Sequence, residues 1–205
     1  MTTQRKADLL LVLITGFWGC SYYLSDLALE EMPPFALCAM RFLLAFALLG
    51  IALFPKLRHV NRKTLLWAVP AGLSLTLTYI GATVGLLYTS ISNAGFICSL
   101  PAVTTPLLTF LLYRKKPERR MLLCLALCTV GLGLLTLGND FRPAAGDLIC
   151  LLCALGYGIN LLVVEHAVRQ PEVDALQLGV FQQLVTGAAM LVLSLLFETP
   201  CLPQT

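Results

Sequence analysis

Six residues in otherwise apolar stretches are the candidates for chemistry in this sequence. They offer an indole, a guanidinium, two phenols, a carboxamide and a backbone carbonyl freed by a proline, and such groups need polar partners in apolar surroundings. The chemistry they allow is recognition of a small molecule through hydrogen bonds, charge and aromatic contact. The six residues are Trp18, Arg41, Tyr79, Asn93, Pro101 and Tyr157.

Arg41 has two interpretations. Its guanidinium could bind an anionic group of a substrate. It also lies only about 10 Å from one end of its apolar stretch, at 1.5 Å of helix per residue. From there its long side chain could reach the interface, or pair with Asp26, Glu30 or Glu31. The sequence leaves both interpretations open.

Trp18, Tyr157 and Pro101 also have structural alternatives. Trp18 and Tyr157 lie near the middle of their apolar stretches, where an aromatic side chain lines a cavity or packs against a neighbouring helix. Pro101 removes a backbone N–H, which either exposes a carbonyl to a cavity or kinks a helix. We predict that all three face one aqueous space together with Tyr79 and Asn93.

Patterns typical of enzymes and metal sites are absent from the sequence. It has no Gly-Lys nucleotide loop, no H-E-x-x-H motif and no paired carboxylates in an apolar stretch. Cys150 and Cys153 have C-x-x-C spacing, but no second pair and no hydrophilic loop accompany them, as a zinc site would require. We therefore predict a protein that is not an enzyme, binds no metal and uses no cofactor, with its cysteines as small packing residues.

The composition explains where these residues must lie. Hydrophobic residues make up 58% of the chain and charged residues 12%, and the mean hydropathy is +0.84. Soluble domains carry about 25% charged residues, whereas a surface that faces lipid excludes charge. The composition therefore predicts a membrane protein in contact with the lipid bilayer.

Seven stretches are long enough to cross the hydrocarbon core, which takes about 20 residues of helix. Helix is expected because unpaired backbone groups are costly in lipid. The sequence thus predicts an all-α membrane protein with about seven transmembrane helices. The predicted spans are 8–27, 34–54, 65–87, 91–112, 121–138, 146–166 and 175–197.

Basic residues between the spans predict the orientation. Lys and Arg accumulate in cytoplasmic loops, and alternate connections of this chain hold twelve of the 14 basic residues, whereas the others hold only Arg142. We predict a multi-pass protein of the plasma (inner) membrane with a cytoplasmic N-terminus and no nucleic-acid partner. The twelve residues are Arg5, Lys6, Lys56, Arg58, Arg62, Lys63, Arg114, Lys115, Lys116, Arg119, Arg120 and Arg169.

The beginning of the first span is repeated in the sixth. At a constant offset, Asp8 aligns with Asp147 and the aromatic-glycine pair at Trp18 aligns with the pair at Tyr157. The first and sixth spans cross the membrane in opposite directions, so the two copies would be inverted. Inverted repeats form binding sites at their interface near the midplane. We therefore expect Trp18 and Tyr157 to share a cavity, with Arg41 at its outer part.

Several short motifs, in this order, resemble the EamA-like members of the drug/metabolite transporter superfamily. That resemblance implies ten spans, arranged as two inverted five-helix repeats around a central substrate cavity. Residues 8–138 would be the first repeat and 146–197 a partial second repeat. The motifs are Phe17-Trp18-Gly19, Pro34, Arg41-Phe42, the run from Tyr88 to Gly95, Leu100-Pro101, Gly131, Gly133 and Gly146-Asp147.

The resemblance implies a carrier of small metabolites or drugs, with two departures. Many members have a glutamate just after the fourth span, where this chain has Lys115. The chain also ends after the seventh predicted span, so we expect a truncated product, or a homodimer or second chain that supplies the missing helices. The alternatives to a transporter are a non-transporting membrane assembly or regulatory subunit, and an inactive fragment.

Overall fold

The computed structural model describes residues 3–114, 122–123, 126–127, 130–131 and 145–198, and the regular structure in these ranges is entirely helical. Six helical segments there are long and apolar enough to cross a membrane. The predicted all-α membrane fold is confirmed. Most of the predicted span 121–138 lies outside the described residues, and the division into repeats over 8–138 and 146–197 stays a prediction.

The helices follow the predicted spans closely, with one division. The predicted span 91–112 forms two helices that meet at Leu100. Pro101 has no N–H to donate to residue 97, and its ring clashes with the preceding turn, so the first helix ends and a second begins. The helices are α1 (Thr3–Leu29), α2 (Pro34–Ala52), α3 (Phe54–Leu57), α4 (Arg62–Leu86), α5 (Ile91–Ser99), α6 (Pro101–Tyr113), α8 (Ala145–Val168) and α9 (Ala175–Phe197).

Side-chain caps fix where several helices begin. The side chain of Asp174 accepts a hydrogen bond from the Gln177 N–H at 2.9 Å at the start of α9, which satisfies one of the free N–H groups there. At the start of α2 the cap comes from the far end of the chain. The Glu198 carboxylate accepts the N–H groups of Phe35 and Ala36 at 2.7 and 2.9 Å. The end of α9 is thereby attached to the beginning of α2.

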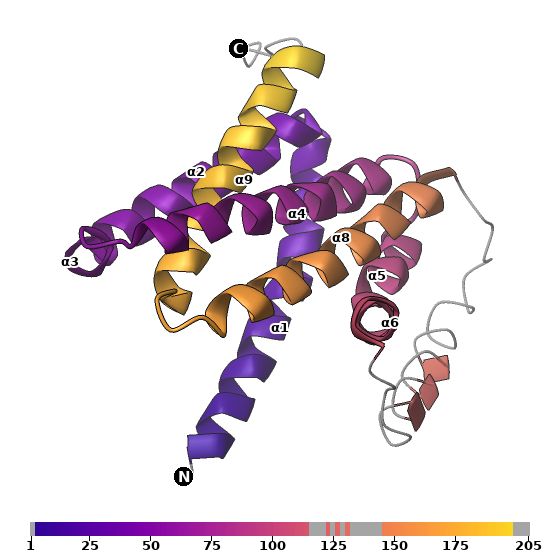
Figure 1. The fold of residues 1–205 in the computed structure, drawn as a ribbon. Coiled ribbons are helices and arrows are strands. Elements are labelled where there is room, and N and C mark those ends of the chain that lie inside the picture. Colours follow the sequence, from indigo (N-terminus) through magenta and orange to yellow (C-terminus); the bar gives the residue numbers. More distant parts are fainter. Residues whose placement is uncertain (1–2, 115–121, 124–125, 128–129, 132–144, 199–205) are drawn as a thin grey trace.

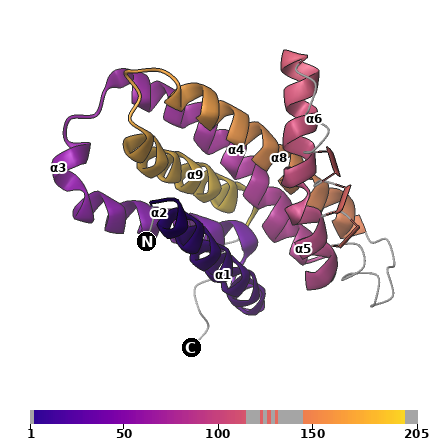
Figure 2. The ribbon, with the colours of Figure 1, turned by 90° about the horizontal axis from the view of Figure 1, so that it is seen from below.

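Helix α4 lies at the centre of the bundle, with α8 packed along it, α9 packed across it at a steep angle, and α2 packed on α9 (Figures 1 and 2). Small residues allow the closest approach. A Cβ built on Gly81 would collide with the backbone nitrogen of Cys153, and one on Gly85 would collide with the Cys150 sulfur. The Gly81-x-x-x-Gly85 motif thus packs α4 closely against α8. Two of the predicted packing cysteines, Cys150 and Cys153, are buried at this contact.

The start of α4, the end of α8 and the start of α9 lie together at one end of the bundle, which we call the α8–α9 end. Apolar packing and polar contacts close this end. Lys63 forms an ion pair with Glu172 at 2.7 Å, and the Gln177 side chain donates to the Lys56 carbonyl at 2.7 Å. These contacts connect the α3–α4 region to the α8–α9 connection. The apolar cluster beneath them consists of Ala68, Ala167, Val173 and Leu178, with Trp67, Val164 and Phe181 against it.

Candidate functional site

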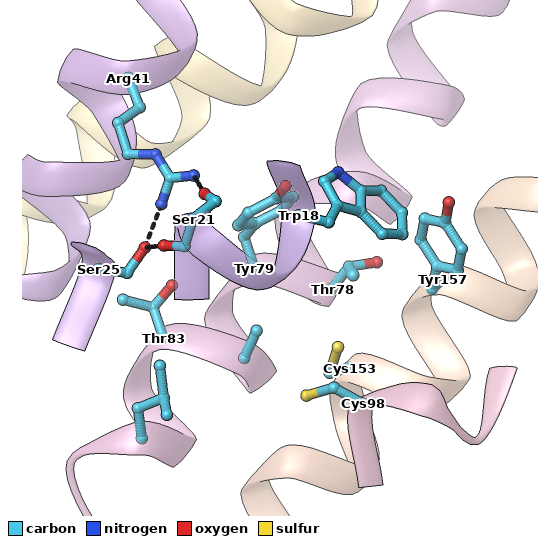
Figure 3. A pocket seen from close by; sticks show the side chains of 12 residues that line it. Trp18, Ser21, Ser25, Arg41, Thr78, Tyr79, Thr83, Cys98, Cys153 and Tyr157 are labelled. Carbon is cyan, nitrogen blue, oxygen red and sulfur yellow. Dashed lines mark hydrogen bonds between the residues drawn. The ribbon is translucent and has the colours of Figure 1, made fainter. Parts of the chain in front are cut away.

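A cavity lies between α1, α2, α4, α5 and α8 (Figure 3). Its volume is about 80 Å³. Because one water occupies about 10–15 Å³ of such volume, the cavity has room for several waters or a small organic molecule. It lies beside the second half of α4 and the first half of α8, away from the α8–α9 end. Its lining residues are Trp18, Ser21, Ser25, Arg41, Thr78, Tyr79, Ala82, Thr83, Leu86, Cys98, Cys153 and Tyr157.

Aromatic side chains form one part of the cavity wall. The rings of Trp18 and Tyr157 meet edge to face, with centroids 5.8 Å apart and planes at 68°. Tyr79 makes a similar contact with Phe42, at 4.6 Å and 87°. Edge-to-face contacts of this kind contribute about 0.5–1.5 kcal/mol beyond area burial. These contacts fix the orientation of the Trp18, Tyr79 and Tyr157 rings. A flat apolar molecule in the cavity can contact the ring faces.

Arg41 provides the charge of the cavity. Its Nη1 donates to the Ser25 Oγ and its Nη2 to the Ser21 Oγ, each at 2.6 Å (Figure 3). Ser25 in turn donates its own hydroxyl proton to the Ser21 carbonyl at 2.6 Å, which leaves its oxygen free to accept. Within the part of the chain that the structure describes, Arg41 has no ion pair with Asp26, Glu30 or Glu31. The guanidinium is therefore oriented by neutral hydroxyls.

Hydroxyl and thiol groups complete the lining. The Thr78 hydroxyl donates to the Ser74 carbonyl at 2.9 Å, within its own helix. Thr83 hydrogen-bonds the Cys38 sulfur at 3.2 Å. Cys98 of α5 lies next to Cys153 of α8 (Figure 3). Over the described ranges, no group of three or more His, Cys, Asp or Glu residues has an arrangement that could hold a metal ion.

The structure brings together four of the six residues that the sequence singled out. Trp18, Arg41, Tyr79 and Tyr157 line the cavity, whereas Asn93 and Pro101 are buried outside its lining. Asn93 lies in the first turn of α5, where its N–H donates to the Ser90 Oγ at 3.2 Å. Pro101 begins α6. A binding role for any of the six stays a prediction.

Eight lining residues were not among the six predicted, and Ser21 and Ser25 matter most of these because they hold the guanidinium of Arg41. The two serines lie three and seven positions after Trp18 on α1, a spacing that places all three side chains on one helix face. That pattern was available in the sequence. The partner helix was not, because the reach of Arg41 from α2 to α1 depends on how the two helices pack.

Comparisons with known proteins identify a matching family and two related transporters. Residues 5–137 match the model of the EamA-like transporter family. An uncharacterized transporter of Archaeoglobus fulgidus is 32% identical over 163 residues, covering 80% of this chain and 50% of the relative. The uncharacterized transporter YetK of Bacillus subtilis is 26% identical over 193 residues, covering 88% of this chain and 57% of the relative. The chain thus spans about half the length of these curated relatives. No solved structure matches it significantly.

Proposed function

Because the chain belongs to the EamA-like transporter family, we propose that it is a non-enzymatic carrier of small metabolites or drugs that binds its substrate in the cavity beside Trp18, Arg41 and Tyr157. One observation supports this most directly. An arginine lies at a cavity between helices that are apolar enough to cross a membrane. A charge in that position is costly. A role in binding a solute accounts for the arginine there, whereas helix packing alone would not require a charged side chain.

The position of the cavity, nearer one end of the bundle than the other, fits alternating access. The cavity lies toward the end of α4 that contains Leu86, while the α8–α9 end is filled by the cluster around Ala68 and Leu178. Ala68 and Leu86 are about 27 Å apart along the helix axis. A carrier needs one open and one closed end, exchanged during its cycle. This conformation would be the one in which the α8–α9 end is closed.

The basic residues suggest how the carrier sits in the cell membrane. Lys56, Arg58, Arg62, Lys63 and Arg169 all lie near the α8–α9 end, and basic residues mark the cytoplasmic side. We propose that this end faces the cytoplasm together with the N-terminus, and that the cavity is closer to the outer face.

We expect the working carrier to include further helices, as in a homodimer or an assembly with a second chain. The length of the relatives supports this, as does the loose packing of α1, in which Trp18 is 50% exposed although it lines the cavity. Native mass measurement in mild detergent tests the proposal. An active monomer would contradict it.

Native cysteines provide a test of the cavity that needs no mutation. Cys153 lines the cavity, whereas Cys38 is fully buried and does not. A small water-soluble thiol reagent should therefore modify Cys153 faster than Cys38, as measured by peptide mass spectrometry after labelling in proteoliposomes. In the same vesicles, solutes should exchange across the membrane, and a transported solute should slow the labelling of Cys153. Equal labelling of both cysteines with no solute exchange would refute the transport function.

A further inference from the structure

We propose that the cavity selects small organic monoanions, with the charged group on Arg41 and a flat apolar body against Trp18, Tyr79 and Tyr157. This substrate class rests on the proposed function of the cavity as the transport site. Three features support it: the charge of the lining, the orientation of the guanidinium, and the distance between the charged and aromatic parts of the wall.

The lining has a single sign of charge. Of the described residues that line the cavity, Arg41 is the one charged side chain, and no Asp or Glu accompanies it. An arginine away from water is costly unless an anion pairs with it. Its two serine partners are neutral, so they satisfy two N–H groups without neutralising the charge. An anionic ligand would supply, inside the cavity, a counter-charge that none of the described lining residues provides.

The serines also hold the guanidinium ready for an anion. Guanidinium carries five N–H donors in a planar fork, and the bonds to Ser21 and Ser25 use one on each terminal nitrogen. The donors that remain suit a carboxylate, which arginine binds with two parallel hydrogen bonds. Since the side chain is already fixed, a ligand would lose little affinity to ordering it.

The spacing of α1 residues sets the size of the ligand. Trp18, Ser21 and Ser25 share one face of α1, so the indole lies about 5–10 Å along the axis from the two hydroxyls that hold the guanidinium. Figure 3 shows Arg41 and the serines on one side and the Trp18–Tyr157 pair on the other, with Tyr79 between them. A carboxylate separated from a flat ring by one or two atoms fits that separation.

The same lining disfavours cations. An ammonium group would find aromatic faces and hydroxyls but no carboxylate among the described lining residues, and Arg41 would repel it. Cation–π contact contributes only about 0.5–2 kcal/mol. A neutral molecule would escape the repulsion but would leave the guanidinium without a counter-ion.

Three matched probes test this in a protein with one tryptophan. Trp67→Phe removes the second of the two tryptophans, so that Trp18 reports binding by its fluorescence. Phenylacetate, phenylacetamide and phenethylamine have similar ring systems and are anionic, neutral and cationic. Phenylacetate should change the Trp18 signal in a saturable way. The amide should bind about 10- to 100-fold more weakly, the difference expected for hydrogen bonds to a charged group, and the amine more weakly still.

Arg41→Gln should abolish the preference for phenylacetate over the amide, while Arg62→Gln, which removes a basic residue away from the cavity, should preserve it. Should Arg41→Gln fail to fold, Ser21→Ala together with Ser25→Ala should reduce the preference and keep the charge. Equal binding of all three probes, or tighter binding of the amine, would overturn the proposal. Solute exchange without anion preference would refute the substrate class alone. Anion binding without any solute exchange would refute transport and leave the binding site intact.

Discussion

Replacing Gly81 by alanine should separate α4 from α8. The added Cβ would lie 2.9 Å from both the Ile149 oxygen and the Leu152 carbonyl carbon, and ordinary contacts begin at 3.4 Å. Because the obstructing atoms are backbone, no rotamer change relieves them, and the helices must move apart by about 0.5–1 Å, which forfeits a quarter to a half of each contact's dispersion energy. Overpacking costs about 1–3 kcal/mol, against about 1 kcal/mol gained when alanine replaces glycine in a helix.

The net loss is up to about 2 kcal/mol, which lowers Tm by up to about 4–8 °C for a chain of this size. Gly179→Ala is the matched control, because nothing lies within 4 Å of a Cβ at Gly179 in α9, so Tm should rise by about 2–4 °C. Thermal scans of both variants in mild detergent measure the difference. A rise in Tm for Gly81→Ala like that of the control would refute the close α4–α8 contact.

Two further predictions concern polar contacts at the helix ends. Glu198→Ala leaves the N–H groups of Phe35 and Ala36 without their carboxylate, so it should cost about 0.5–2 kcal/mol in denaturant unfolding, whereas an unchanged midpoint would contradict the cap. The hydrogen bond from Lys63 lowers the pKa of Glu172 below its ordinary value of 4.5. The contribution of the Glu172–Lys63 ion pair to stability is therefore complete above about pH 4.5 and disappears as the pH falls through the lowered pKa of Glu172. The gap in Tm between wild type and Glu172→Gln should follow that pH course, and a gap that persists at pH 2 would exclude the ion pair as its cause.

The helices were predictable from the sequence because lipid imposes a strict rule on them. Apolar length alone located α2, α4, α8 and α9, with ends within a few residues of the observed ones. The interruption by Pro101 was also visible, although its outcome was left open between a freed carbonyl and a kink. Hydropathy reports that a segment is buried in lipid or protein, and it does not report which neighbour it contacts.

The site was less predictable because it depends on those neighbours. The internal repeat led us to expect Trp18 and Tyr157 in one space, and their rings do touch. Asn93 was chosen for its amide, yet it is buried away from the cavity. For Arg41 the sequence offered three nearby carboxylates as partners, whereas the structure pairs it with two hydroxyls of α1. A choice of partner across helices follows from packing geometry, which residue type alone does not encode.

Among the described residues that line the cavity, Arg41 alone carries a charge, and this has an electrical consequence under the proposed cycle. The empty cavity carries one positive charge, and a cavity occupied by a monoanion carries none. Movement of the loaded carrier would then be electroneutral, and the membrane potential would act on the return of the empty one. Moving one charge across the whole membrane potential corresponds to about 2.3 kcal/mol per 100 mV. The energy for Arg41 would be the fraction of that value that matches the share of the potential its charge crosses during the cycle. Net uptake into vesicles should therefore respond to an imposed voltage, while exchange of one anion for another should not.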